Sequence, residues 1–248
     1  MTLSFEQTVP EPSSHVGGSD QAQVDPDPVY RPEVYQPQED SRLLVDCLRA
    51  VPGLIGARAL DLCTGSGVLA QAAAHLGARS VVAVDLSEAA VRSARERCRD
   101  APCQVEVRLG RFQDQVGRGR YDVVTCNPPY VPAPDPRDGV EASPGPAHAW
   151  DAGPDGRAVL DPLCAVAAEF LEPGGTMLVV QSEFADVTAT VRALRATGLH
   201  ADVMARWSVP FGPVMTARAD WLERRGLLEY GCRTEGLVVV RAVKRDVA

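Results

Sequence analysis

The chain has 248 residues, a formal net charge of −8 and 45% hydrophobic residues. Such a length can bury one large hydrophobic core or two small ones. This net negative charge argues against a protein that binds nucleic-acid phosphates over a wide surface. The sequence shows neither a signal peptide nor an apolar run long enough to cross a membrane, so we expect no membrane partner.

Seven cysteines are scattered along the chain without any Cys-x-x-Cys pair. An odd count at irregular spacing is not typical of a disulfide framework or of a zinc site. We therefore predict free thiols, a cytoplasmic location and no metal centre. The seven are Cys47, Cys63, Cys98, Cys103, Cys126, Cys164 and Cys232.

Residues 1–30 are rich in Pro, Ser, Gly, Gln and Asp, which predicts a disordered tail, and residues 31–248 are expected to form a single domain. Hydrophobic periodicity predicts a first helix and then alternating strands and helices. The helices are predicted over 39–50, 68–76 and 87–99, and the strands over 58–63, 80–85, 104–109 and 121–126. This alternation indicates βαβ units and a parallel sheet, so the expected fold class is α/β.

A long loop, 127–153, follows the fourth strand, and loops of this length inside a compact domain are usually functional or disordered. The pattern beyond it predicts three more helices and three more strands, which makes seven strands in all. The helices are predicted over 156–171, 184–196 and 217–228, and the strands over 176–181, 201–209 and 236–243.

The turn Thr64-Gly65-Ser66-Gly67 follows the first strand and begins a helix. Its small residues allow a ligand close to the backbone, and a helix N-terminus offers free N–H groups. Asp85 ends the second strand, 24 residues after Asp61, where an acid can accept both hydroxyls of a ribose. The turn lacks the Gly-x-Gly-x-x-Gly pattern, because Cys63 takes the first glycine position, and it lacks the lysine of a phosphate-binding loop. The pattern favours a nucleoside ligand without a pyrophosphate, such as S-adenosylmethionine.

The fourth strand ends in Asn127-Pro128-Pro129-Tyr130. Because neither proline can donate to a sheet ladder, the pair forms a stiff corner at the carboxyl end of the strand, where open parallel sheets bind ligands. The Asn127 side-chain oxygen and the Pro128 carbonyl can each accept one N–H of a planar amide or amine and so orient its nitrogen for methyl transfer. Tyr130 can stack on the flat face of such a group. The alternative is a corner that only ends the strand.

Three motifs together resemble class I S-adenosylmethionine-dependent methyltransferases, and most closely the HemK/PrmC-like family of protein-(glutamine-N5) methyltransferases that act on release factors. They are Asp61-Leu62-Cys63-Thr64-Gly65-Ser66-Gly67, Val84-Asp85-Leu86-Ser87 and Asn127-Pro128-Pro129-Tyr130-Val131-Pro132. Segments 35–41 and 149–157 are similar to the shorter, archaeal–eukaryotic branch, which lacks a large N-terminal helical domain. The resemblance covers about 34–185 and weakens beyond, where a helical segment around 210–230 looks like an insertion.

The resemblance implies a seven-stranded Rossmann-like methyltransferase sheet, mostly parallel with an antiparallel last strand, and helices on both faces. It also implies a set of residues around the cofactor. The methionine moiety would be held by Asp61 and the backbone of 63–67, which includes Cys63, Thr64, Gly65 and Gly67. Asp85 would hold the ribose, Leu86 would pack on the adenine, Ser41 and Asn127 would lie near the cofactor, and Tyr35 and Pro37 would cover it.

Adenine binding departs from the family pattern. The family has Gly-Asp after the third strand, and the aspartate accepts the adenine amino group. This chain has Gly110-Arg111 followed by Phe112, and an arginine cannot accept that hydrogen bond. Arg111 and Phe112 remain the residues expected beside the adenine, with Asp114 or backbone groups as the acceptor.

On the acceptor side, we expect Asn127, Pro128 and Tyr130 to be catalytic and Asn127, Pro129, Tyr130 and Trp150 to bind the substrate. Trp150 has an alternative role, which is to cover the sheet edge. Arg157 is expected to bridge the corner loop to the following helix.

The first hypothesis for function is a glutamine N5-methyltransferase of a protein, with a release-factor-like Gly-Gly-Gln loop as substrate. Methylation of an adenine amino group in nucleic acid is an alternative, which the acidic charge disfavours, and a flat small molecule is another. A cofactor-binding scaffold that has lost transfer is the non-enzyme alternative, supported only by Cys63 and Arg111. The resemblance to the shorter branch adds a small activator subunit as a candidate partner.

Overall fold

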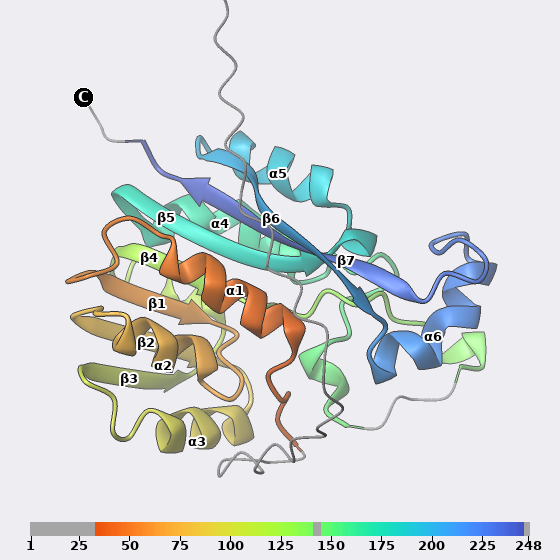
Figure 1. The fold of residues 1–248 in the computed structure, drawn as a ribbon, viewed down its shortest axis with the longest axis horizontal. Coiled ribbons are helices and arrows are strands. Elements are labelled where there is room, and N and C mark those ends of the chain that lie inside the picture. Colours follow the sequence, from red (N-terminus) through yellow and green to blue (C-terminus); the bar gives the residue numbers. More distant parts are fainter. Residues whose placement is uncertain (1–32, 141–144, 246–248) are drawn as a thin grey trace, which may run out of the picture.

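The computed structural model describes residues 33–140 and 145–245, so the tail predicted over 1–30 lies outside the described residues (Figure 1). The strands are β1 (Arg58–Leu62), β2 (Ser80–Asp85), β3 (Gln104–Leu109), β4 (Tyr121–Cys126), β5 (Leu171–Ser182), β6 (His200–Pro210) and β7 (Thr234–Val243). The α-helices are α1 (Glu39–Arg49), α2 (Val68–His75), α3 (Glu88–Arg97), α4 (Leu160–Phe170), α5 (Val187–Ala196) and α6 (Pro213–Arg224).

The strands form one seven-stranded sheet in the order β3-β2-β1-β4-β5-β7-β6. The pairs from β3 to β5 are parallel, whereas β7 is antiparallel to both β5 and β6. The predicted fold class is therefore confirmed, including the antiparallel last strand. Because chain order reverses between β1 and β4, their carboxyl ends frame the crevice in which such sheets bind ligands. The reversed direction of β7 brings its first residues to that same edge.

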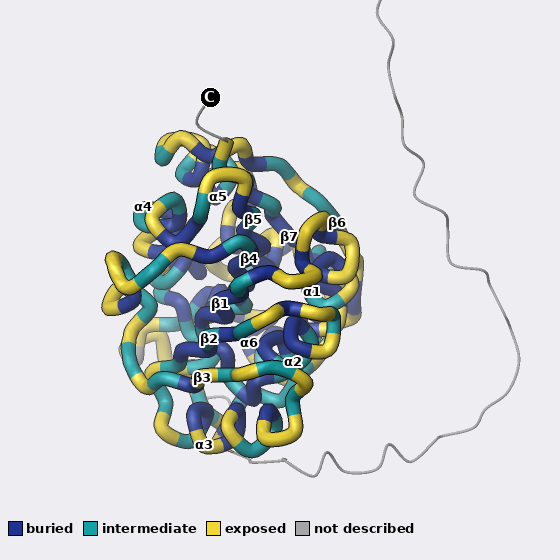
Figure 2. The backbone as a smooth tube through the Cα atoms, turned by 90° about the vertical axis from the view of Figure 1, so that its left-hand side faces the viewer, coloured by how far each residue is buried: buried dark blue, intermediate teal, exposed yellow. Residues whose placement is uncertain are grey.

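Helices cover both faces of the sheet (Figure 1). Helices α1, α2 and α3 pack on one face and α4 and α5 on the other, while α6 lies beyond the ends of β6 and β7. The backbone is most deeply buried along the central strands, and exposed segments follow the outer sides of the helices and loops (Figure 2). None of the helices in the described part of the chain has the length and apolar content that a membrane crossing requires.

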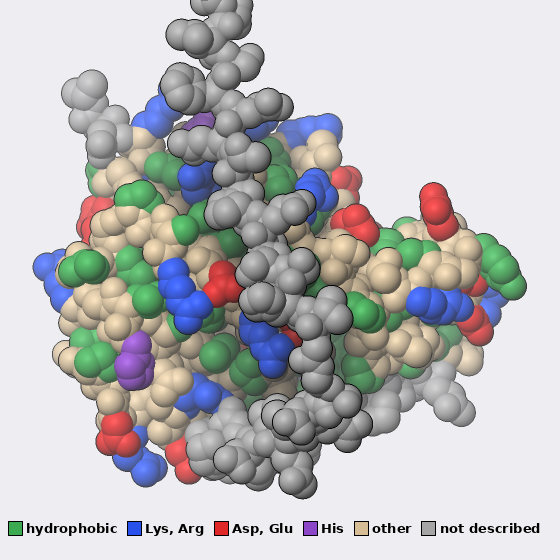
Figure 3. Space-filling model, in the orientation of Figure 1, with side chains coloured by type: hydrophobic (Ala, Val, Ile, Leu, Met, Phe, Trp, Pro, Cys, Tyr) green, Lys and Arg blue, Asp and Glu red, His purple; other side chains and the backbone are tan. Residues whose placement is uncertain are grey.

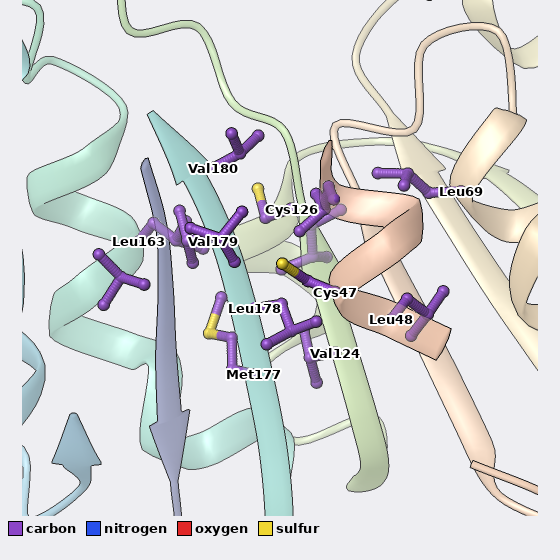
Figure 4. Close-up of a cluster of buried hydrophobic side chains, with 14 of the residues drawn as sticks. Cys47, Leu48, Leu69, Val124, Cys126, Leu163, Met177, Leu178, Val179 and Val180 are labelled. Atoms are coloured by element: carbon purple, nitrogen blue, oxygen red, sulfur yellow. The ribbon is translucent and has the colours of Figure 1, made fainter. Parts of the chain in front are cut away.

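The core forms around β4 and β5, whose side chains meet helices on both faces (Figure 4). Leu48 of α1 packs on one side and Leu163 of α4 on the other, and both side chains are fully buried. Cys47 and Cys126 also belong to this cluster, and all seven cysteines are free thiols. Burial on this scale makes the hydrophobic effect the main force that holds the strand ends in place.

Several element boundaries differ from the prediction, and three of the differences have a clear physical reason. Helix α6 begins at Pro213 rather than at 217, because proline is well suited to the first turn of a helix. Helix α4 begins at Leu160 rather than at 156, since residue 156 packs against the Tyr130 carbonyl of the corner as part of the preceding loop. Strand β5 begins at Leu171 rather than at 176, so it includes Pro173, Gly174 and Gly175, and the sheet accommodates them as a register shift between Tyr121 and Val123.

Candidate active site

A cavity of about 540 Å³ opens at the carboxyl ends of β1 and β2. Its wall includes the glycine turn, the end of β2, the segment after β3 and the leader before α1. Of the residues predicted to bind the cofactor, those that line it are Tyr35, Pro37, Ser41, Cys63, Thr64, Gly65, Asp85, Leu86, Arg111, Phe112 and Asn127. Asp61 and Gly67 are absent from the wall of this cavity.

Asp61 lies beneath the turn and supports it from inside. The side chain is 1% exposed, and its two oxygens accept hydrogen bonds from the hydroxyls of Thr64 (2.5 Å) and Thr125 (2.7 Å). Burial raises the pKa of Asp61 to about 6, although those two hydrogen bonds oppose the shift. A direct contact between Asp61 and the methionine moiety stays a prediction, while the structure shows that this carboxylate ties β1 and β4 to the turn.

Gly67 is required for packing between helices. It adopts φ +85°, and a Cβ atom there would lie 2.8 Å from the Cα of Ala94 on α3. The glycine therefore lets α2 and α3 approach each other closely. Cys63 is a non-glycine residue with φ +55°, so it occupies the left-handed region that its position in the turn demands.

Asp85 is half-buried at the end of β2 and faces the cavity. Its oxygens accept hydrogen bonds from the backbone N–H groups of Gly65 (2.8 Å) and Ser87 (2.9 Å). Burial raises the pKa of Asp85, and these N–H groups oppose the shift. The carboxylate is thus held in a fixed orientation that leaves lone pairs for a ligand's hydroxyls.

The outer wall of the cavity is apolar. Leu86 is 65% exposed although it is a large apolar residue, and Phe112 lines the same cavity. Asp114 does not line the cavity, because its side chain accepts the Arg111 backbone N–H (3.1 Å) and so caps a short 3₁₀ turn, Phe112–Gln115. Gln113 lines the cavity instead, so the amino group of an adenine would meet its amide or backbone rather than Asp114.

A second cavity, of about 230 Å³, lies on the other side of the Asn127 corner, and we call it the acceptor cavity. All the residues predicted to be catalytic or to bind substrate line it, namely Asn127, Pro128, Pro129, Tyr130 and Trp150. Four residues line both cavities: Tyr35, Asn127, Pro129 and Ala149. The corner is therefore the shared wall at which a group in one cavity can meet a group in the other.

Asp40 determines which way the Asn127 amide points. Asp40 is 3% exposed, and its Oδ2 accepts from Asn127 Nδ2 (3.0 Å), Tyr130 OH (3.0 Å) and Tyr35 OH (2.9 Å). A carboxylate can only accept, so the Asn127 amide must turn its NH₂ toward Asp40 and its oxygen away. Burial and the Asp40 charge also raise the pKa of Tyr130, which keeps its hydroxyl protonated as a donor.

The loop after the corner is fastened by backbone and side-chain contacts. Val131 N donates to the Trp150 carbonyl (2.9 Å), and Ala152 N donates to the Val131 carbonyl (3.0 Å), so Trp150 is held beside the acceptor cavity. Gly156 has φ +75°, and a Cβ there would lie 2.4 Å from the Tyr130 carbonyl oxygen, which only glycine avoids.

Two buried arginines connect this loop to the rest of the chain. Arg157 binds Asp161, the Asp186 carbonyl (2.9 Å) and Thr190 (3.1 Å), which confirms its predicted bridging role. Arg218 of α6 is 4% exposed and binds Asp151 and the Pro132 carbonyl (2.9 Å). The segment that resembles an insertion is therefore part of the acceptor side.

Three acids that were not predicted from the sequence line the acceptor cavity: Glu39, Asp40 and Glu235. Asp40 lies in the first turn of α1, where an acid is sufficiently explained by the helix dipole. Glu235 lies near the start of β7, where nothing in the local pattern indicates a site. For Asp40, its proximity in sequence to Tyr35 and Ser41 is the one signal that could have suggested a role.

These features define a class: a Rossmann-like, S-adenosylmethionine-dependent methyltransferase with two cavities that meet at one strand-end corner. A profile of the methyltransferase small domain family matches residues 35–140. A Methanocaldococcus jannaschii protein that bears the name protein N5-glutamine methyltransferase is 30% identical over 191 residues, which cover 76% of this chain and 92% of that protein. The chain belongs to the protein N5-glutamine methyltransferase family.

A second relative agrees with this assignment, and a solved structure agrees with the fold. The release factor glutamine methyltransferase of Mycolicibacterium smegmatis is 38% identical over 182 residues, which cover 71% of this chain and 63% of that enzyme. The chain thus spans slightly less than two thirds of that relative. Among solved structures, the Mtq2–Trm112 complex of E. cuniculi, responsible for methylation of the eRF1 translation termination factor, matches with a TM-score of 0.56 and 20% identity, covering 86% of this chain and 99% of that one. At this identity the match concerns the fold.

Proposed function

We propose that this enzyme transfers a methyl group from S-adenosylmethionine to the side-chain amide nitrogen of a glutamine in a protein, with a release-factor-like loop as the first substrate to test. The observation that carries the proposal is the Asn127 corner. Its amide NH₂ is held by Asp40, so its oxygen remains available to accept an N–H from a substrate in the acceptor cavity. The names of the related enzymes support glutamine as the methylated residue.

The larger cavity fits the cofactor by size and by chemistry. Its volume of about 540 Å³ falls within the range of small-molecule sites, about 300–1,000 Å³. Asp85 would accept the ribose hydroxyls, Leu86 and Phe112 would pack on the adenine, and the backbone of 63–66 would hold the methionine moiety. When bound there, S-adenosylmethionine supplies an electrophilic methyl group on a sulfonium.

The chain's own contribution is positioning. An amide nitrogen is a poor nucleophile because its lone pair is delocalised into the carbonyl. The Asn127 oxygen and the Pro128 carbonyl would each accept one of its N–H bonds, which orients the nitrogen and favours the positive charge that develops during transfer. Tyr130 is held by Asp40 with its ring at the cavity wall. No general base is required before transfer, because the proton can leave afterwards.

Charge on the surface also favours a protein over a nucleic acid. On the face shown in Figure 3, Arg and Lys side chains are interspersed with Asp and Glu rather than gathered into one patch. The net charge is −8. A protein of this kind has little long-range attraction for phosphates. The free thiols suit a reducing cytosol, in which we place the reaction.

The test is a tritiated-methyl transfer assay with a release factor, tRNA and DNA as substrates. We expect label on a protein glutamine, and Asn127→Ala should lower transfer about 100- to 1,000-fold while the cofactor Kd changes by no more than about threefold. Gln104→Ala, an exposed amide at the start of β3, is the control. Label on nucleic acid, or an Asn127→Ala variant that fails only because it no longer binds cofactor, would contradict the proposal.

A second readout is specific to this chain. Asn127 is its only asparagine, so ¹⁵N-asparagine labelling gives a single side-chain NH₂ pair in an NMR spectrum. That pair should shift on addition of a glutamine-containing peptide. The need for a small activator subunit stays a prediction, and it is tested by comparing the transfer rate of the chain purified alone with its rate after addition of cell extract.

A further inference from the structure

Two buried polar atoms in the acceptor cavity have no hydrogen-bond partner: Nε1 of Trp150 and Oε2 of Glu235. Both residues are 8% exposed. Buried polar groups in native proteins are nearly always paired, so two unpaired atoms on residues that line one small cavity point to a ligand that supplies the partners. The indole N–H can only donate, whereas the carboxylate oxygen can accept.

The two tyrosines and the asparagine of this wall do not serve these two atoms, because their hydrogen bonds are made elsewhere, and the side-chain contact of Glu235 with Ser182 leaves Oε2 unpaired. The hydroxyls of Tyr35 and Tyr130 donate to Asp40, and the Asn127 NH₂ donates to Asp40 and to the Ser41 hydroxyl. None of the residues lining the acceptor cavity, all of them in the described part of the chain, is an arginine, lysine or histidine. Glu235 therefore has no cation beside it on that wall.

The position of Glu235 follows from the sheet topology. Strand β7 is antiparallel to its neighbours, so its second residue lies at the edge where β4 ends in the corner. Glu235 and Leu237 face the cavity together, and the Gly236 backbone between them is held by Glu183 (2.9 Å). Trp150 reaches the same cavity from the loop that pairs with Val131.

We propose that Glu235 and Trp150 bind the main chain of the substrate residue that carries the methylated amide: Glu235 accepts a peptide N–H and Trp150 donates to a peptide carbonyl. This inference rests on the proposed function and makes it more specific. The site would then select an amide that is carried on a polypeptide. Glu235 and Trp150 are specificity-determining residues in this scheme, and Asn127 keeps the role of orienting the reacting nitrogen.

A count of donors and acceptors supports a peptide. The Asn127 oxygen, the Pro128 carbonyl and Glu235 offer three acceptors, and Trp150 offers one donor. A peptide glutamine supplies two side-chain N–H groups, a main-chain N–H and a main-chain carbonyl, whereas the exocyclic amine of adenine supplies only two N–H groups and would leave Glu235 unpaired. Guanine meets the count, but the acids on the cavity wall, Glu39, Asp40 and Glu235, oppose a phosphate-bearing ligand.

The first experiment uses Trp150→Phe with Trp221→Phe as its matched control. Trp221 is a buried tryptophan outside the acceptor cavity, and its Nε1 donates to Asp138 (3.1 Å). With a Gly-Gly-Gln peptide as substrate, Trp150→Phe should lower kcat/KM about five- to tenfold without lowering Tm, since it removes an unpaired group. Trp221→Phe should lower Tm by about 2–4 °C and leave kcat/KM unchanged.

The second experiment uses Glu235→Leu and Glu235→Gln. The leucine variant should lose about tenfold in kcat/KM and keep or raise its Tm, whereas glutamine retains an acceptor oxygen and should stay within about threefold of wild type. Peptides in which each main-chain N–H is replaced in turn by an ester oxygen should reveal one position that costs the wild type about tenfold. At that position Glu235→Leu should show no further loss.

Three outcomes would overturn this inference. Wild-type kcat/KM in both Trp150→Phe and Glu235→Leu would mean that water alone satisfies the two atoms. A Glu235→Gln variant as impaired as Glu235→Leu would mean that Glu235 binds a cationic side chain. Transfer to guanosine or RNA would assign the pocket to a base. If the wild type labels no glutamine of any peptide or protein, the proposed function itself fails, and the wild-type control shows this before any variant is compared.

Discussion

The larger cavity, to which we assign the cofactor and which we call the cofactor cavity, shares Asn127 with the acceptor cavity. The two cavities are nevertheless formed by different kinds of segments. The cofactor cavity is lined largely by turns that directly follow β1, β2 and β3, so neighbours in sequence are neighbours in space. The acceptor cavity joins the leader, the corner, the 147–150 loop, α6 and the start of β7. At the centre of the acceptor cavity, Asp40 accepts hydrogen bonds from Asn127 and Tyr130, which lie 87 and 90 residues further along the chain.

This difference has a functional consequence. A cavity made of strand-end turns keeps its shape as long as the parallel sheet is intact, which suits a cofactor common to many enzymes. A cavity assembled from distant segments can change with any one of them, which suits a substrate that differs between enzymes. Substitutions in the cofactor cavity should therefore change the affinity for the cofactor, whereas substitutions in the acceptor cavity should change substrate turnover.

The largest effect is expected from Asp40→Asn. The variant keeps the size of the side chain but places an NH₂ among three donors, so the Asn127 amide loses the partner that orients it. We expect transfer to fall at least about 100-fold and the free energy of unfolding to fall by about 2 kcal/mol, measured by turnover and urea denaturation. Asp46→Asn, exposed on the same helix and bound to Arg49, should behave like wild type. Normal turnover in Asp40→Asn would remove the basis for the orientation of Asn127.

The next effect concerns the pH dependence of stability. The pKa of Asp61 is about 6 in the folded chain, above its value of about 3.9 when unfolded. A raised carboxyl pKa contributes stability that is fully present below the unfolded pKa and is lost as pH rises through the folded pKa. The contribution of Asp61 should therefore fall by about 2 kcal/mol between pH 4 and pH 7.

Asp61→Asn should lack this particular pH dependence. Urea denaturation of both proteins at several pH values between 4 and 7 measures it. A difference in unfolding free energy between wild type and variant that stays constant across this range would show that Asp61 does not titrate there. Asp122→Asn, a half-buried acid that accepts the Arg58 backbone N–H at the opposite edge of the sheet, serves as the control.

A smaller effect is expected from Asp85→Ala on the cofactor side. Loss of the carboxylate should raise the Kd for S-adenosylmethionine about 10- to 30-fold, or about 1.4–2 kcal/mol, by calorimetry. At saturating cofactor, kcat should remain within about threefold of wild type. Asp114→Ala, which lies outside the cavity, should bind nearly as well as wild type. A lower kcat with an unchanged Kd for the cofactor would contradict this role and would indicate that Asp85 acts on the substrate instead.

The smallest effect is expected from Cys63→Gly. Cys63 has φ +55°, a region that side chains other than glycine occupy at a cost. Glycine relieves that cost but loses more chain entropy on folding, so we expect stabilisation of at most about 1 kcal/mol and little change in cofactor Kd. Thermal denaturation measures the first and calorimetry the second. A clear loss of stability would show that the Cys63 side chain contributes packing near Cys126.

The sequence by itself determined the elements and the cofactor half of the site. Strand and helix positions follow from hydrophobic periodicity, and the glycine turn and Asp85 lie where each strand ends, because these features depend on residues close together in the chain. The corner was also evident, since two consecutive prolines must end a central strand.

Only the tertiary structure decided the acceptor half. The role of Asp40 depends on Tyr35, Asn127 and Tyr130 meeting around one carboxylate. The place of Glu235 depends on β7 running antiparallel, and one buried arginine of α6 binds the loop that follows the corner. Such contacts join residues distant in sequence, and no local pattern of hydrophobicity or turn chemistry records which of them will meet.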